Sequence, residues 1–160
     1  MFSLYSKGCE YTLRALICGL ELTNGQGFRA EDACREAKVP ESFTRKGFQR
    51  LAHRGILQTV KGPGGGYRFP SSTRTISILQ IVRIVDGEEA YRHCVMGLSQ
   101  CVDKAPCPIH EIWKKMKKRL IGELSRTSLH QIIHSSKKKA RLGLLEKEPK
   151  RKYCANHQKS

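Results

Sequence analysis

Residues 62–66 read Gly-Pro-Gly-Gly-Gly, and this run restricts the fold more than any other stretch of the 160-residue chain. Four glycines and a proline within five residues are incompatible with the interior of a helix or of a regular strand. The run lies between the β-prone segment 56–60 and the short segment 67–69. We therefore predict a β-hairpin with an exposed glycine tip, whose backbone amides can approach a phosphate backbone closely.

Three helices are predicted ahead of this hairpin. From Ser6 to Leu22, apolar residues recur at intervals of three and four, and Ser6 is suited to cap the helix. A second helix is expected at 29–38, because Pro40 forbids its continuation. A third fits 41–54. In that third helix the side chains expected to face the core are Phe43, Phe48, Leu51 and Ala52, and those expected to face mostly outward are Arg45, Lys46, Gln49, Arg50 and His53.

A winged helix-turn-helix typically contains two helices joined by a tight turn, and its second helix is cationic and is followed by a basic hairpin. Between Lys38 and Arg74 there are eight Lys or Arg and one acid, Glu41. The alternative is an ordinary loop with solvated cations, but it does not explain why helix, wing and charge occur together. We expect duplex DNA as the partner. Candidate contacts on this helix and wing are Arg50, Lys61, Gly64, Gly65 and Tyr67.

The overall charge supports a polyanionic partner. The chain has 30 Lys plus Arg against 14 Asp plus Glu, a formal net charge of +16. Its seven cysteines are an odd number, and no secretory signal opens the chain, so we expect reduced thiols in the cytoplasm. No apolar stretch approaches the ~18 residues of a membrane span. The glycine run lacks the Gly-Lys-Ser/Thr ending of a nucleotide-binding loop, and no acid, base and nucleophile converge, so an enzyme is not expected.

Three cysteines and a histidine occupy one short polar segment: Cys94, Cys101, Cys107 and His110. Soft thiolates at close spacing suit an iron-sulfur cluster, zinc or Cu(I). Zinc is less favoured, because its cysteines usually come in pairs two to four residues apart and this segment has no such pair. The alternative is three unrelated reduced cysteines, although their polar neighbours differ from the apolar surroundings typical of a buried thiol.

Downstream, the apolar segment 77–87 predicts a helix buried between two larger bodies. A long helix is expected from Pro108, with an apolar stripe formed by Ile109, Ile112, Trp113, Met116, Leu120 and Leu124. That stripe packs on its own domain or, as we prefer, pairs with a second copy of the chain. Residues 125–128 interrupt the helix, and 129–133 add a last turn. The expected organisation is a DNA-binding domain at 1–87, a cluster loop at 88–107, a dimerisation helix at 108–134 and a basic disordered tail at 135–160.

These motifs together resemble the Rrf family of bacterial winged-helix regulators, which includes IscR and NsrR. The likeness rests on the opening segment 6–16, on the wing 61–67 and on the three-cysteine loop that leads into a long helix, and it covers the chain to about residue 133. It implies a mainly α fold with a β-hairpin wing, and a homodimeric transcription factor that acts as a repressor on a palindromic operator. It also implies a redox-labile iron-sulfur cluster, 2Fe-2S or 4Fe-4S, that alters DNA affinity in response to iron status, nitric oxide or oxidants.

Residue by residue, the resemblance places cluster thiolates at Cys94, Cys101 and Cys107, and base-reading side chains at Ser42, Arg45 and Lys46. The fourth ligand has three candidates. His110 matches the IscR-like arrangement and is favoured by its nearness to the cysteines, Glu10 matches an NsrR-like acidic ligand from the other subunit, and Cys9 is beside it. Six residues separate Cys94 from Cys101, more than in many members, so the cluster type stays open. The alternative function is a cluster-free regulator that senses thiol oxidation or a partner protein.

Overall fold

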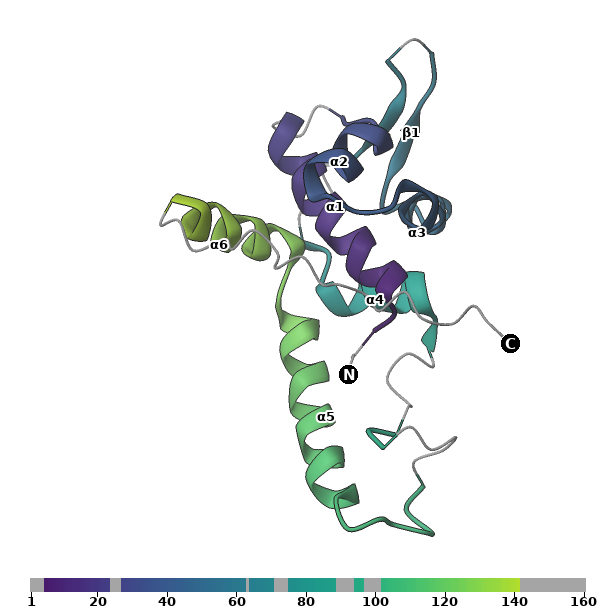
Figure 1. Cartoon of the computed structure of the whole chain (residues 1–160), viewed down its shortest axis with the longest axis vertical. Helices are drawn as coiled ribbons and strands as arrows, with labels where there is room; N and C mark the ends of the chain where they lie inside the picture. Colours follow the sequence, from purple (N-terminus) through teal and green to yellow (C-terminus); the bar gives the residue numbers. More distant parts are fainter. Residues whose placement is uncertain are drawn as a thin grey trace, which may run out of the picture.

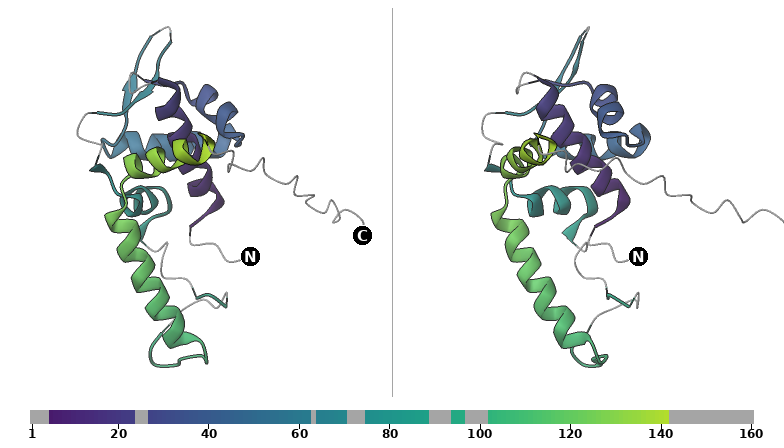
Figure 2. Two further views of the ribbon diagram at one scale, coloured as in Figure 1. Left: turned by 90° about the vertical axis from the view of Figure 1, so that its left-hand side faces the viewer. Right: turned by 60° about the vertical axis from the view of Figure 1, so that its left-hand side comes forward.

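Six helices and one two-stranded hairpin make up the part of the chain that the computed structural model describes, which is residues 5–23, 27–62, 64–70, 75–88, 94–96 and 102–141. The first four helices and the hairpin form a head, and the fifth helix leaves it as a long arm (Figure 1). The last helix turns back and lies against the head (Figure 2). Within the described residues, no helix is long and apolar enough to cross a membrane.

Helix α1, Lys7–Thr23, runs through the centre of the head. The predicted cap is confirmed, because Ser6 Oγ accepts a hydrogen bond from the backbone N–H of Cys9 at 3.1 Å. Asp86 fixes this cap in turn, accepting from Ser6 N at 2.6 Å and from Ser6 Oγ at 2.5 Å. The start of α1 is therefore tied to a residue 80 positions further along the chain.

Helices α2, Ala30–Ala37, and α3, Glu41–His53, form the predicted helix-turn-helix. Lys38 ends α2 in the left-handed conformation, with φ 53°, and Pro40 precedes α3. The buried face of α3 consists of Thr44, Gly47, Phe48 and Leu51. Phe43, which we expected to face the core, is instead 60% exposed. It lies at the border of the apolar arc, where the helical period alone does not decide which side a residue takes.

Gly47 allows α1 and α3 to approach each other closely. A Cβ atom built on Gly47 would overlap Thr12 Oγ1 and would lie 2.8 Å from Thr12 Cγ2. Thr12 is fully buried, and its hydroxyl donates to the carbonyl of Gly8 at 2.8 Å, so it is not free to turn away. The glycine thus has a packing role in addition to the propensity penalty of about 1 kcal/mol relative to alanine.

The wing is the antiparallel pair β1, Gln58–Val60, and β2, Gly66–Arg68, in the register Gln58↔Arg68. Its base is joined to the head because Phe28 and Tyr67 exchange both backbone hydrogen bonds, at 2.7 and 2.8 Å. Four rings surround this junction and connect the wing to α3; they are Phe28, Phe48, Tyr67 and Phe69. The hairpin is therefore held at a fixed place beside α3.

Helix α4, Ile78–Asp86, packs against α1, α3 and α5 and is buried as predicted. It begins with a capping box, in which Ser77 Oγ accepts from Gln80 N at 3.2 Å and Gln80 Oε1 accepts from Ser77 N at 3.0 Å. An isolated β-bridge joins Ser77 to Ser128, where α5 ends and α6 begins. Ser77 therefore organises the joint between the head and the arm.

Replacing Ser77 with alanine tests this joint. We expect Ser77→Ala to lower the free energy of unfolding by about 1 to 2 kcal/mol, because the N-cap bond is lost in a buried setting. Ser125→Ala is the matched control, since that exposed hydroxyl only donates to the carbonyl of Gly122. Urea denaturation measures both. Equal destabilisation by the two variants would contradict the role given to Ser77.

Helices α5, His110–Arg126, and α6, Leu129–Arg141, complete the chain that is described. The arm begins at His110, two residues after the predicted Pro108, because Ile109 adopts a non-helical conformation at the N-cap. The prediction of a single last turn and of a tail disordered from 135 was wrong for 135–141, which continue the helix. Leu129 and Ile133 are buried in the core and anchor α6, so good helix formers such as Lys and Ala can extend it. Residues 142–160 lie outside the described chain.

Candidate nucleic-acid interface and cysteine loop

The outward face of α3 carries the predicted base-reading side chains. Ser42, Arg45 and Lys46 are all exposed, and Gln49 and His53 continue the same face toward the end of the helix. Since Thr44, Phe48 and Leu51 hold the opposite face in the core, this face is directed away from the head. An exposed helix face with cationic and hydrogen-bonding side chains fits insertion into the major groove.

Two arginines of α3 already have partners in the free chain. Arg45 forms an ion pair with Glu41 one turn earlier, with Nε and Nη2 each 2.5 Å from Glu41 Oε1. Arg50 donates to the backbone carbonyl of Val85 at the end of α4. Arg50, predicted as a DNA contact, therefore also links α3 to the helix that leads into the cysteine loop.

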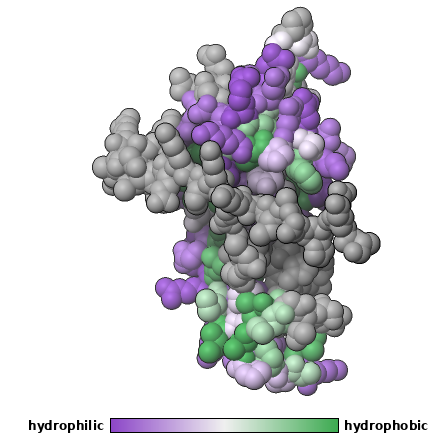
Figure 3. Space-filling view, viewed as in Figure 1, coloured by the Kyte–Doolittle hydropathy of each residue, from purple (hydrophilic) through white to green (hydrophobic). Residues whose placement is uncertain are grey.

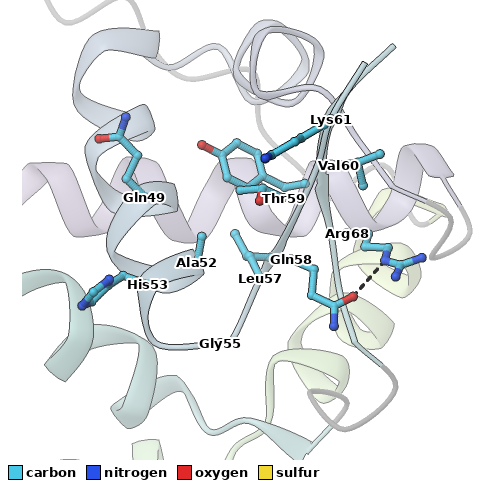
Figure 4. A pocket seen from close by; sticks show the side chains of 11 residues that line it. Gln49, Ala52, His53, Gly55, Leu57, Gln58, Thr59, Val60, Lys61 and Arg68 are labelled. Carbon is cyan, nitrogen blue, oxygen red and sulfur yellow. Dashed lines mark hydrogen bonds between the residues drawn. The ribbon is translucent and has the colours of Figure 1, made fainter. Parts of the chain in front are cut away.

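A hollow of about 910 Å³ lies between α3 and the wing. Figure 4 shows α3 on one side and the strands on the other, with Lys61 extending back toward α3. Arg68 Nε donates to Gln58 Oε1 at 2.9 Å across the two strands. Lys61 and several hydrogen-bonding side chains thus line the hollow beside the recognition face. Such groups are the ones that bind a DNA backbone.

The remaining predicted wing residues differ in position. Lys61 and Gly64 are exposed, and Gly64 has φ +81°, which a side chain would strain. Gly65 donates its N–H to the carbonyl of Gly62 at 2.8 Å and closes the tip. The ring of Tyr67 lies 5.3 Å from that of Phe48, centroid to centroid, so it anchors the wing. Tyr67 therefore contributes chiefly by positioning the other three residues, Lys61, Gly64 and Gly65.

The Glu41–Arg45 pair leads to a prediction about DNA affinity. The Glu41 carboxylate repels phosphates and occupies the Arg45 guanidinium, so Glu41→Gln should tighten duplex binding by about three- to tenfold at low salt. Fluorescence anisotropy at several salt concentrations measures this. Glu111→Gln, which removes the same charge from exposed α5, is the control and should change affinity by less than about twofold. Unchanged or weaker binding by Glu41→Gln would contradict the prediction.

The cysteine loop is described in part, at 94–96 and 102–109, and these pieces lie near the N-terminal end of α5, far from the wing (Figure 1). The backbone N–H of His110 donates to the carbonyl of Cys107 at 2.9 Å. His110 is 4% exposed, and its Nε2 lies 2.8 Å from Asp103 Oδ1. Hydrogen bonds from Lys114 and then from His110 hold the pKa of Asp103 below its usual value. Two of the four predicted ligands, Cys107 and His110, are therefore adjacent.

Among the described residues, Cys94 and Glu10 are not brought together with these two. Cys94 is buried, and Cys101 lies outside the described residues. Considering only the residues with described positions, no group of three or more His, Cys, Asp or Glu side chains is arranged to hold a metal ion. Glu10, the alternative fourth ligand, is on the first turn of α1 and pairs with Lys7 at 2.5 Å.

Burial lowers the reactivity of the thiols of the head. Burial raises the pKa of Cys9 far above its usual value, and Cys9 is fully enclosed in the core. Burial, followed by the charges of Glu21 and Glu36, raises the pKa of Cys18 to about 11, and burial also raises the pKa of Cys34. Because the thiolate is the reactive and metal-binding form, these three thiols are poorly suited to ligation or sensing.

Sequence reasoning missed Asp103 as the partner of His110, and it predicted Gln49 to face outward without naming it as a DNA contact. Asp103 is seven residues before His110 in an irregular loop, a spacing with no periodic signal. Gln49 could have been found, since it is seven residues after Ser42 and hence on the same helical face.

Comparisons with known proteins agree with this geometry. The Rrf2 family model, described as iron-dependent transcriptional regulator, matches residues 5–135. An HTH-type transcriptional regulator of Aquifex aeolicus is 26% identical over 137 residues, 84% of this chain and 94% of that protein. IscR of Klebsiella pneumoniae is 27% identical over 104 residues, 65% of this chain and 63% of IscR, so the match spans less than two thirds of that relative.

Solved structures show the same fold. CymR of B. subtilis, the global cysteine regulator of that organism, superposes with a TM-score of 0.66 at 16% identity, covering 84% of this chain and 98% of CymR. IscR of T. potens superposes with a TM-score of 0.61 at 17% identity, covering 82% of this chain and 86% of IscR. With the family match over most of its length and the winged helix in its structure, this chain belongs to the Rrf2 family of helix-turn-helix transcriptional regulators.

Proposed function

We propose that this regulator is a homodimeric repressor whose operator affinity is switched by an iron-sulfur cluster in the cysteine loop. The observation that carries the proposal is the position of that loop. It connects α4, which Arg50 links to the recognition helix, with α5, the arm. A change in the loop therefore acts on both the recognition helix and the arm. A coupling of about 1 to 3 kcal/mol is enough to alter operator occupancy.

The donor set fits such a cluster. Cys94 and Cys107 are unpaired by disulfides, and the backbone N–H of His110 is bonded to the carbonyl of Cys107, while Cys101 completes the set in the sequence. When bound, the cluster would supply a crosslink within the loop that is labile to oxidants and nitric oxide. Asp103 orients the His110 ring by accepting a hydrogen bond from its Nε2, and Lys114 keeps Asp103 ionised for that purpose.

For the fourth ligand, the geometry favours His110 over Glu10. His110 is held next to Cys107, whereas Glu10 is on α1 and engaged by Lys7. Cys9 is disfavoured because its thiol is enclosed in the core. Replacing His110 and Glu10 in turn with alanine and recording the absorption and paramagnetic resonance spectra of the loaded protein distinguishes them, since only removal of a ligand changes the iron environment.

The dimer is supported by the arm. Ile112 is 63% and Met116 60% exposed on α5, while Trp113, on the same helix, is buried. Figure 3 shows hydrophobic side chains gathered over the lower part of the molecule, and hydrophilic ones over the upper part. An apolar helix face of this extent is what a second copy of the same helix would cover.

A cluster-free regulator that senses thiol oxidation is the second candidate. The structural likeness to CymR, including CymR of Staphylococcus aureus in an oxidized form, at a TM-score of 0.61, favours it. Since the head thiols have raised pKa values, the sensing cysteines would again be those of the loop. Both candidates thus assign the sensing role to the cysteine loop. They differ in whether the loop binds iron and sulfide.

Anaerobic purification followed by an absorption spectrum and by iron and acid-labile sulfide analysis tests the proposal. We expect a coloured protein with matched iron and sulfide, and complete loss of both in Cys101→Ala. Cys18→Ala, which removes a thiol of the head, is the matched control and should keep the colour. Colourless protein under cluster-reconstituting conditions would contradict the cluster and leave the thiol sensor.

A further inference from the structure

Phe43 is an exposed aromatic residue in the first turn of the recognition helix. Its side chain is 60% exposed, although it is among the most hydrophobic residue types. The core face of α3 is complete without it, since Thr44, Phe48 and Leu51 are fully buried there. The fold therefore gives no packing reason for an aromatic ring at this position.

The neighbours of Phe43 are residues of the DNA-reading face. Ser42 precedes it, and Lys46 is one turn further along, so the three side chains form one exposed group at the start of α3. In helix-turn-helix proteins, the N-terminal residues of the recognition helix are the ones that contact base edges. The exposed apolar residues Ile112 and Met116, by contrast, lie on α5.

We propose that Phe43 is a specificity-determining residue that contacts the C5-methyl group of thymine in the major groove. That methyl is the apolar group that the major-groove edges of the bases present, and aromatic side chains are suited to contact it. Covering the ring with a methyl group removes apolar surface of both partners from water. The inference rests on the proposed function, because it takes α3 to lie in the major groove of an operator. It extends that function by naming thymine as the base that the helix selects.

The contact should have a measurable effect on affinity, and a duplex that lacks the thymine methyl group provides its control. Deoxyuridine pairs as thymine does but lacks the methyl group, so a twin duplex with deoxyuridine in place of one thymine in each half-site differs from the thymine duplex by those two methyl groups alone. At ~0.8 kcal/mol per buried carbon, one methyl contributes about fourfold in affinity, and two half-sites contribute about 15-fold. No change in folding is expected, because an exposed ring contributes little to stability.

The experiment uses a duplex selected by the full chain from a random-sequence library, together with its deoxyuridine twin. Wild type should bind the twin about 15-fold more weakly. Phe43→Ala should bind the thymine duplex about as weakly as wild type binds the twin, and should not distinguish the two. Phe43→Leu, which keeps apolar surface, should retain part of the discrimination. Urea denaturation of each variant checks that the head remains folded.

Two results would overturn the inference. One is equal binding of both duplexes by wild type, and the other is undiminished thymine preference in Phe43→Ala. If Phe43→Ala loses dimerisation measured by analytical ultracentrifugation while its thymine preference persists, the ring belongs to a protein interface and the inference is likewise overturned. Failure of the chain to select any duplex is a separate result, which would contradict the proposed function itself and the inference with it.

Discussion

Gly47→Ala should lower the free energy of unfolding by about 2 to 4 kcal/mol, although alanine is the better helix former. The added Cβ would overlap Thr12 Oγ1 and would lie 2.8 Å from Thr12 Cγ2. Thr12 is buried and β-branched, and its hydroxyl is bonded to the carbonyl of Gly8, so α1 and α3 must separate. Urea denaturation followed by circular dichroism measures the loss.

Gly122 provides the matched control for helix propensity. It lies within α5, and a Cβ there would meet only the flexible end of Arg126, at 3.2 Å. Gly122→Ala should therefore raise the free energy of unfolding, by up to about 1 kcal/mol. Thr12→Ala in the Gly47→Ala background should recover part of the stability by removing both overlapping atoms. If Gly47→Ala stabilises the protein as Gly122→Ala does, the close packing of α1 on α3 is contradicted.

Replacing Arg45 and Lys46 together with alanine should weaken operator binding on the order of 10²-fold. A base contact by arginine is worth about 1 to 3 kcal/mol, and loss of a phosphate contact by lysine reduces the salt dependence by about one unit. Both side chains are exposed on the recognition face, so the fold should be unaffected. Affinity for operator and for unrelated duplex, each over a range of salt concentrations, separates the base contact from the phosphate contact.

Lys115 and Lys118 serve as the control for charge alone. Both are exposed on α5, and their replacement with alanine removes the same two positive charges from the arm. We expect this control to change operator affinity by less than about threefold, since screening weakens charges remote from the DNA. If the two double variants lose affinity equally, binding depends on net charge and α3 does not read the operator.

Local patterns predicted the elements of the head. The glycine run identified the wing, and the apolar spacing identified α1, α3 and α4, because these signals come from residues within one turn or one hairpin. Phe43 was misplaced because it lies at the edge of the apolar arc of α3. The extent of α6 was missed because its anchors, Leu129 and Ile133, gain their burial from contact with a distant part of the chain.

The interactions that connect the site to the fold depend on long-range contacts, which a single sequence does not reveal. Gly47 packs on Thr12, a residue 35 positions earlier on another helix. Likewise, Arg50 bonds the carbonyl of Val85, and Ser6 bonds Asp86, across separations of 35 and 80 residues. The cysteines and His110 were recognised as a donor set by residue type, whereas the orientation of His110 by Asp103 required the structure.

The central claim is that the state of the cysteine loop changes operator affinity. The most direct test compares cluster-loaded and cluster-free protein, under anaerobic conditions and at one salt concentration, on duplexes selected separately by each form. The account predicts that the affinities of the two forms for at least one of these duplexes differ by about 5- to 150-fold. Equal affinities of the two forms for every selected duplex would contradict it.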